Sequence, residues 1–422
     1  MKRLVQILPF YLLLLSINLN AQKAKDSYST SSVLASGQWF KIAVTSDGIY
    51  RIDYSRLKQL GLANPSNPRI FCNNTGQLSY YNNDPKPDDL KELAFYTSGS
   101  DGILKEGDYL LFFAKGTHRW IYNETSKEYD FLRHNYSDTA FYFITSGTTP
   151  GKKIVAAAEP SQAANYLSSE SDALFIHEEE SENLIKSGRE WFQHILNLDI
   201  NPGFTDLIAS ELVKYKIRVA ARASVSTIFR IYEGVSLKKS IQVQGIDLFN
   251  YTGTQARIAS DTGSMLSESG TPVYQIRFFN NGETNANGWV DYLQLRGRKS
   301  NTFTSQQMQY SDSRSVATGR ITNFTIRSQV NDVLVWDVSD PLNVKQIQYT
   351  KTSDNITFKS LNDSLKTFIA FTTGIILTPS IIPATIPNQN LHGSDPVDMI
   401  IITHPFFKTY AEKLANIILN NS

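Results

Sequence analysis

The chain has 422 residues, of which 41% are hydrophobic, 12% aromatic and 19% charged. This length exceeds one ordinary domain, so we expect two or three domains. The net charge is only +1 and no basic cluster lies beyond the extreme N-terminus, which argues against binding of nucleic acid or another polyanion.

The first 21 residues predict a secretory signal peptide. Lys2 and Arg3 form its charged region, and residues 4–19 are almost entirely apolar. This apolar run is shorter than the roughly 20 residues that a membrane-spanning helix needs, so cleavage is favoured over a membrane anchor. The mature protein is therefore expected to be exported, either water-soluble or held at a membrane by partners.

Cleavage is expected near Ala21 and Gln22, and a polar leader extends over residues 22–35. Cys72 is the single cysteine, so the chain cannot form an internal disulfide. An exported protein without disulfides needs cores large enough to be stable alone.

Residues 36–160 predict a β-rich N-terminal domain. Alternation over residues 39–44 indicates a strand, Asp47-Gly48 is a turn signal, and residues 49–52 resume a strand, which together predict a hairpin. A short helix is expected over residues 54–60, ending at Gly61. Further strands are predicted at residues 93–96, 109–114 and 140–144.

Residues 161–379 predict an antiparallel β-sandwich, jelly-roll-like or related. Val213, Tyr215, Ile217 and Val219 share one face of a strand, with charged residues on the other face. Many short alternating strands bounded by Gly, Asn, Asp and Ser are typical of such folds. The other predicted strands cover residues 227–232, 240–243, 274–278, 289–295, 332–338, 356–359 and 367–371.

A proline-rich connector, residues 380–396, leads into the last segment, residues 397–422. The apolar run at residues 399–402 predicts a strand covered on both faces, and residues 406–417 have helical spacing. One strand and one helix cannot bury each other. We therefore expect this segment to be the first βα unit of a truncated α/β domain, with its sheet neighbours downstream of Ser422 or on another chain.

Cys72 is the only thiol that could act as a nucleophile. It lies in "IFCNNTG", with no local signature of the histidine base and oxyanion donor that a catalytic cysteine needs. Packing as a small hydrophobic residue at a strand end is the favoured interpretation.

An acidic stretch around residues 176–193 is the most unusual polar segment. His177, Glu178, Glu179, Glu180 and Glu182 leave a metal cluster open, but their spacing matches no His/carboxylate motif of known geometry. A solvated or ion-paired segment is favoured. The adjacent Arg189 and Glu190 are expected to pair across a seam between domains.

Two further positions carry weak chemical signals. Asp291 and Asp337 each lie beside an aromatic residue in a predicted strand, and paired carboxylates can do acid–base chemistry. Nothing in the sequence brings them together, so a scaffold role is favoured. His404 follows the last predicted strand, where α/β proteins place ligands, although a loop or capping role is commoner for a single histidine.

Five strings, in this order, resemble the gingipain-like sortases (peptidase family C25) of the type IX secretion system of Bacteroidetes. They are "GQWFKIAVTSDGIYRIDYSRLKQLGL" (residues 37–62), "SGREWF" (187–192), "GWVDYLQLRGR" (288–298), "VWDVSDP" (335–341) and "NQNLHGSDPVDMIIITHPFFKTYAEKLA" (388–415). The resemblance implies that residues 397–422 begin a caspase-like α/β peptidase domain.

The resemblance also implies an activity and partners. Members of this family lie at the outer membrane surface, remove C-terminal signal domains from exported cargo and join the cargo to anionic lipopolysaccharide. Their His–Cys dyad lies beyond the first βα unit, so the catalytic residues are expected downstream of Ser422 and this chain alone is expected to be inactive. No cofactor is implied, and metal binding is left open.

Two alternatives stay open. One is a non-catalytic surface protein, such as a β-sandwich adhesin or a secretion accessory protein. The other is the prosegment of a gingipain-like secreted protease, cut within the proline-rich connector.

Overall fold

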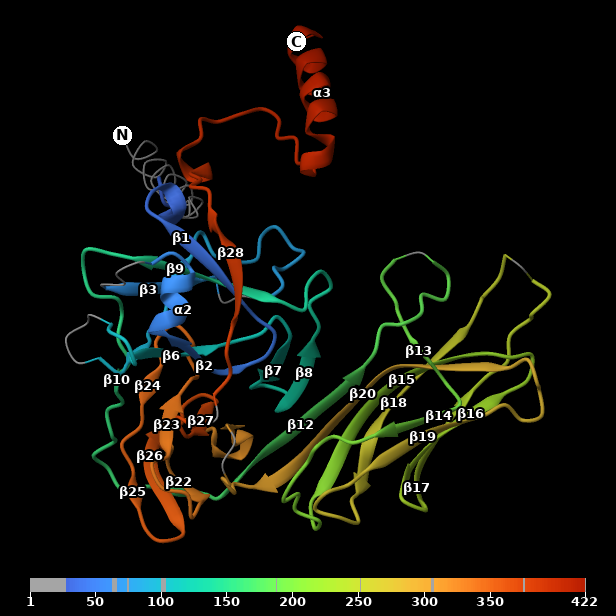
Figure 1. The fold of residues 1–422 in the computed structure, drawn as a ribbon. Helices are drawn as coiled ribbons and strands as arrows, with labels where there is room; N and C mark the ends of the chain where they lie inside the picture. The colour runs from blue at the N-terminus through green and yellow to red at the C-terminus, as the bar shows by residue number, and fades with distance from the viewer. Residues whose placement is uncertain are drawn as a thin grey trace, which may run out of the picture. The chain divides into compact units, whose positions relative to one another are not determined.

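The computed structural model describes residues 28–62, 67–73, 76–99, 104–186, 188–250, 252–304, 307–374 and 376–421 (Figure 1). The predicted signal peptide and its cleavage point at Ala21 and Gln22 lie outside the described residues. The described chain forms two compact units. The smaller holds residues 28–39, 85–90 and 385–421, and the larger holds residues 40–84 and 91–384.

The first part of the larger unit contains two small sheets and a helix. One sheet has the order β28-β1-β9-β3-β4 and the other the order β2-β6-β5. The helix α2 ends at Gln59 and Leu60 is its C-cap. Gly61 follows with a φ of 99°, a left-handed conformation that favours glycine. The elements are β1 (Trp39–Val44), β2 (Gly48–Asp53), α2 (Tyr54–Gln59), β3 (Pro68–Cys72), β4 (Lys91–Glu92), β5 (Tyr96–Thr97), β6 (Tyr109–Ala114), β9 (Ala140–Ser146) and β28 (Ser380–Ile386).

The hairpin predicted at Asp47-Gly48 is wrong, although both of its strands form. β1 pairs with β9, whereas β2 pairs with β6 in the second sheet. The chain turns at Asp47 and crosses between sheets because the apolar faces of β1 and β2 both line one core, which includes Ile42 and Ile52. Burial of both strands in that core prevails over the local turn preference.

The strand predicted at residues 93–96 is also only partly correct. Only Tyr96 of this segment belongs to a strand, β5, and β4 ends just before the segment at Glu92. Leu93, Ala94 and Phe95 lie between the two strands and are buried. Phe95 makes a single bridge to Lys153 instead of extending either strand. The apolar run therefore reports burial here and not continuous pairing.

A jelly-roll sandwich forms the middle of the larger unit, coloured from green to yellow in Figure 1. Its two four-stranded sheets have the orders β12-β20-β15-β18 and β14-β19-β16-β17, with β13 added on β20. Numbered along the chain without β13, these orders are 1-8-3-6 and 2-7-4-5, which is the jelly-roll arrangement of two Greek keys. The strands are β12 (Glu170–Glu178), β13 (Gln193–Ile195), β14 (Asn197–Ile200), β15 (Leu212–Arg222), β16 (Thr227–Glu233), β17 (Ser236–Val243), β18 (Arg257–Leu266), β19 (Tyr274–Phe279) and β20 (Asn287–Ser300).

The predicted inward faces of the sandwich are confirmed. Val213, Tyr215, Ile217 and Val219 of β15 are buried in a core that both sheets share. Alternation with period two thus identifies the core face of this strand.

The strands predicted at residues 332–338, 356–359 and 367–371 form, but they lie outside the jelly roll. They belong to two further sheets, ordered β10-β24-β23-β27-β21 and β11-β22-β26-β25. These sheets contain β10 (Val155–Ala156), β11 (Tyr166–Ser168), β21 (Met308–Tyr310), β22 (Ile321–Arg327), β23 (Leu334–Asp337), β24 (Lys345–Gln346), β25 (Thr350–Lys351), β26 (Asn355–Leu361) and β27 (Phe368–Phe371).

The sheet that contains β2 and β6 is buried on both faces. Ile49, Leu111 and Phe113 pack with residues of β23 and β27, such as Trp336, in one core. Their neighbours Leu110 and Phe112 face the other core. This explains the unbroken apolar string of β6, since a strand covered on both sides has no polar face.

The smaller unit is held by hydrogen bonds around the 3-10 helix η2 (Val33–Ala35). The Ser32 amide donates to Asn390 Oδ1 at 2.8 Å and the Val33 amide donates to Asp89 Oδ2 at 2.7 Å. Its other helical elements are η4 (Leu391–Gly393), η5 (Pro405–Phe407) and α3 (Lys408–Asn421).

The strand predicted at residues 399–402 does not form, whereas the helix that follows is confirmed as α3. A strand needs a backbone partner, and none of the described residues pairs with this segment. None of the helices in the described ranges has the length and apolar content needed to cross a membrane.

The tight contact between the two sheets of the sandwich generates a stability prediction. A Cβ atom at Gly288 of β20 would lie 2.4 Å from Phe278 Cδ2. Gly288→Ala should therefore lower the free energy of unfolding in urea by about 1–3 kcal/mol. Gly374→Ala is the matched control because a Cβ there meets nothing within 4 Å. Equal stability of the two variants would contradict the packing described.

Candidate functional site

A buried ion network joins three parts of the larger unit. Arg298 of β20 donates from Nη1 to Asp172 Oδ1 at 3.2 Å and from Nη2 to Asp312 Oδ1 at 2.8 Å. All three side chains are nearly inaccessible, at 7%, 1% and 1% exposure. Asp172 lies on β12 of the sandwich, and Asp312 is the N-cap of the 3-10 helix η3 (Ser313–Ser315).

A β-hairpin, β7 (Arg119–Asn123) with β8 (Glu128–Leu132), reaches the same network. The Tyr129 hydroxyl donates to Asp172 Oδ2 at 3.1 Å, and Arg296 donates to Glu128 Oε2 at 3.1 Å and to Asp172 Oδ1 at 3.4 Å. Burial and the Asp172 charge raise the pKa of Tyr129, so it stays a neutral donor.

The buried charges at the centre of this network balance. Two guanidinium groups, Arg296 and Arg298, face two buried carboxylates, Asp172 and Asp312. Asp172 also accepts from the Ser313 hydroxyl at 2.9 Å and the Ser313 amide at 2.8 Å. Buried charges are tolerated when each is paired and hydrogen-bonded. The network can therefore hold the hairpin, the sandwich and η3 together.

Sequence reasoning missed this network, although its signal is present in "LRGRKS". Residues two apart on a strand share a face, so Arg296 and Arg298 project together while Gly297 faces the sandwich core. A Cβ atom at Gly297 would lie 2.6 Å from Leu207 Cδ1. Two arginines flanking a buried glycine in a strand indicate that the face of the sheet opposite the core is covered by another part of the protein that pairs with their charges.

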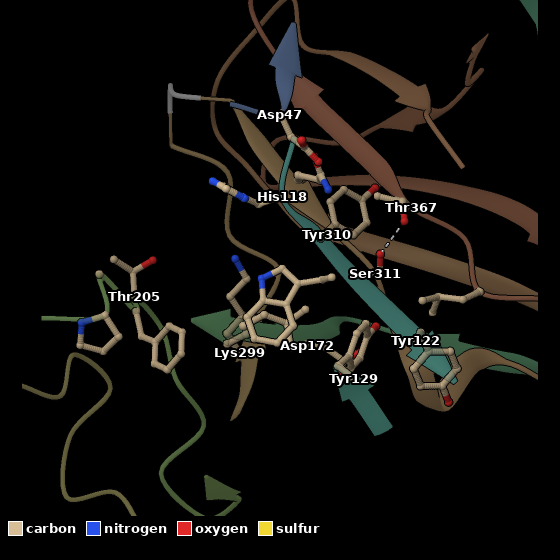
Figure 2. Close-up of a pocket in the computed structure, with 18 of the residues that line it drawn as sticks. Asp47, His118, Tyr122, Tyr129, Asp172, Thr205, Lys299, Tyr310, Ser311 and Thr367 are labelled. Atoms are coloured by element: carbon tan, nitrogen blue, oxygen red, sulfur yellow. Dashed lines mark hydrogen bonds between the residues drawn. The ribbon is translucent and has the colours of Figure 1, made fainter. Parts of the chain in front are cut away.

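A cavity of about 460 Å³ lies next to the network (Figure 2). Figure 2 shows Lys299 and His118 along one side of this space and Ser311 with Thr367, whose hydroxyls are 2.9 Å apart, along the other. Asp47, Lys115, Trp120, Tyr122, Tyr129, Asp172, Phe204, Thr205 and Tyr310 also line it.

Two lysines give this cavity its electrostatic character. Burial lowers the pKa of both Lys115 and Lys299. The charge of Asp47 acts in the opposite direction on Lys115, and that of Asp206 does so on Lys299. His118 is engaged: its Nε2 lies 3.1 Å from Asp138 Oδ1 and its Nδ1 accepts from the His134 amide at 3.0 Å. The ammonium groups of Lys115 and Lys299 form no hydrogen bond or ion pair with any residue that the structure describes.

The acidic stretch at residues 177–182 makes hydrogen bonds and an ion pair within the chain. His177 pairs with Gln193 at 2.7 Å, Glu179 accepts from Gln193 at 2.8 Å, and Glu182 accepts from Trp289 Nε1 at 2.8 Å. Glu180 pairs with Arg133 at 3.3 Å. In the part of the chain that the structure describes, no group of three or more His, Cys, Asp and Glu side chains is placed to hold a metal ion.

Glu178 differs from its neighbours. Burial raises its pKa to about 7, and the nearby carboxylates of Asp291 and Glu180 act in the same direction. Its carboxyl group is therefore held in a place that disfavours the charged form.

Arg189 and Glu190 do not pair with each other. Glu190 binds Arg218, and Arg218 also binds Asp291, all within the sandwich. Arg189 instead lies over the Tyr80 ring, 5.6 Å from its centroid. The expected pairing of Arg189 with Glu190 is therefore wrong.

Asp291 and Asp337 are not brought together. β15 pairs Arg218 with Tyr292 and Val219 with Val290, which leaves Asp291 as the extra residue of a β-bulge. The bulge places its carboxylate on Arg218. Asp337 lies in β23, in a different sheet, and accepts from Ser339. Both residues therefore have scaffold contacts.

Cys72 and His404 take structural positions. Cys72 of β3 is buried in the core that contains Ile42 and Ile52, as a small hydrophobic residue would be. His404 caps η5, with its Nδ1 accepting from the Phe406 amide at 3.2 Å. The strand end expected beside His404 does not form.

The buried ion network generates a second prediction. Arg298→Met leaves two buried carboxylates without their main partner and should cost about 3–5 kcal/mol in the free energy of unfolding. Lys216→Met, which removes an exposed pair with Asp130, should cost less than about 1 kcal/mol. Adding Asp312→Asn to Arg298→Met should recover part of the loss. If Arg298→Met and Lys216→Met lower the free energy of unfolding by the same amount, the network does not stabilise the fold as described.

Glu178 generates a pH prediction. Because its pKa is about 7 in the fold and its ordinary value is 4.5, the native state binds more protons between these values and stability falls as pH rises. Glu178→Gln removes this effect. The variant should gain stability relative to the natural protein as pH rises from 5 to 8, measured by denaturation at each pH. A difference that stays constant with pH would contradict the assignment.

Comparison with known proteins supports a relationship in fold. No protein-family model and no curated protein matches the chain. Dimeric latent PorU from Porphyromonas gingivalis matches with a TM-score of 0.76 and 20% identity, over 92% of this chain and 36% of that chain.

Two other solved structures are too dissimilar to carry an argument. The Cry8Ea1 delta-endotoxin from Bacillus thuringiensis has a TM-score of 0.20 and 8% identity, over 61% of this chain and 52% of its own. A cycloisomaltooligosaccharide glucanotransferase from Paenibacillus sp. has a TM-score of 0.16 and 8% identity, over 52% and 47%. The match to PorU, in contrast, shows that the chain has a PorU-like fold, and the chain spans 36% of the PorU chain.

Proposed function

We propose that this chain is the N-terminal, positioning part of a cysteine endopeptidase and sortase of the type IX secretion system. The observation that carries the proposal is the PorU-like fold, which extends over 92% of the chain. The five strings that resemble this family, in the same order, support it. In this proposal the protein acts at the outer membrane surface after export by its signal peptide.

The described residues would supply a frame and not the chemistry. Cys72 is buried in a core, which leaves it inaccessible to a peptide substrate. The catalytic dyad is expected in the part of the PorU-like protein that this chain does not span. The two β-rich regions would then hold the peptidase domain and dock partners.

The end of the chain supports this arrangement. Exposed apolar side chains gather on α3 and on the segment before it: Met399, Ile400, Ile402, Phe406, Tyr410, Leu414 and Ile417. An apolar surface of this kind marks a place where another part of a protein packs. In the proposed protein it packs into a caspase-like α/β peptidase domain.

The proposed partners are the C-terminal signal domains of cargo, other type IX components of the outer membrane, and anionic lipopolysaccharide as acceptor. A test follows in a strain that has a type IX system. Deletion of the gene should leave cargo with uncleaved C-terminal signal domains, detected by mass spectrometry of surface proteins. The intact gene, supplied in trans, should restore cleavage.

Cys72→Ala in the complementing gene is the matched control. It should restore cleavage as the natural gene does, at equal protein level, since this thiol is buried in a core. Normal cargo processing in the deletion strain would refute the proposal and favour an adhesin or accessory protein. Loss of processing in the Cys72→Ala strain, with the protein present, would show that Cys72 itself reacts.

A further inference from the structure

The cavity beside the ion network is lined by two lysines that form no direct ion pair with a described residue. Lys115 and Lys299 line the same space, and neither ammonium group has an ion-pair or hydrogen-bond partner within the described ranges. Burial lowers the pKa of each lysine, and the nearby carboxylates of Asp47 and Asp206 oppose this only in part.

The carboxylates near the cavity are already occupied. Asp172 accepts from two arginines, Tyr129 and Ser313. Asp47 accepts from the Gly116 amide at 2.8 Å and lies 3.9 Å from Arg119. Asp47 and Asp206 act on Lys115 and Lys299 through their charge, but no described carboxylate forms an ion pair with either lysine. The two ammonium groups therefore keep their hydrogen-bond donors available to a ligand.

A purely structural role does not explain these lysines. A half-buried ammonium without a partner opposes folding, and an apolar residue of similar length would be more favourable there. Retaining two such groups around one open space is typical of a site that needs them for a ligand. The volume of about 460 Å³ falls in the range of small-molecule sites.

We propose that this cavity binds a small organic anion through the ammonium groups of Lys115 and Lys299, with carboxylate or phosphate oxygens as the recognised groups. The Ser311 and Thr367 hydroxyls on the facing wall offer further hydrogen bonds to such a ligand (Figure 2). The site is independent of the proposed peptidase function.

Calorimetric titration at constant ionic strength tests the proposal, with citrate, inorganic phosphate and glucose as probes. The chain should bind citrate or phosphate, and glucose should give no heat of binding. Binding of citrate alone would identify a carboxylate site, and binding of phosphate alone a phosphate site. Absence of binding by both anions, or equal binding of glucose, would overturn the proposal.

Two variants separate binding from stability. Lys299→Met should weaken anion binding at least tenfold without lowering the melting temperature of the unliganded protein, because an unmatched charge is removed. Lys91→Gln, an exposed lysine outside the cavity, is the matched control and should bind as the natural protein does. Unchanged affinity in Lys299→Met, or a fall in its melting temperature with no change in affinity, would show a structural lysine and no anion site.

Discussion

The larger unit depends on one buried guanidinium. Arg298 lies between the carboxylates of Asp172 and Asp312, which belong to the sandwich and to η3. Arg296 completes the charge balance and, through Glu128, extends the network to the β7–β8 hairpin. Ion pairs of this kind add little net stability over apolar packing, but breaking one is costly, so they favour a single arrangement of the parts that they join.

Apolar burial supplies the rest of the frame. The sheet of β2 and β6 is covered on both faces. One face packs in the core that contains Ile42 and Ile52, and the other packs against residues of β23 and β27. Segments more than 200 residues apart, such as Phe113 and Trp336, therefore share a core. A frame with both features suits a protein that must hold other domains in fixed positions, which is the role proposed for this PorU-like chain.

The sequence predicted most strands and the inward faces of the jelly roll, because alternation with period two reports burial directly. It did not predict how strands pair across the chain. The Asp47-Gly48 turn favours a hairpin locally, yet the shared core sends β1 and β2 into different sheets. The ion network was missed for the same reason, since Arg298 meets Asp172 and Asp312 only after β12, β20 and η3 are assembled. Asp291 acquires its role through a bulge, which alternation does not reveal.

If the ion network joins the parts of the larger unit, the sheet of β2 and β6, the jelly roll and the sheet of β23 should unfold as one cooperative unit. Hydrogen–deuterium exchange of the chain in increasing urea measures this most directly. We expect the slowest amides of β6, β15 and β23 to exchange with a common free energy of opening, equal to that of global unfolding. Exchange of β15 with a distinctly lower free energy of opening than β6 and β23 would show that the sandwich unfolds alone and that the ion network does not couple these parts.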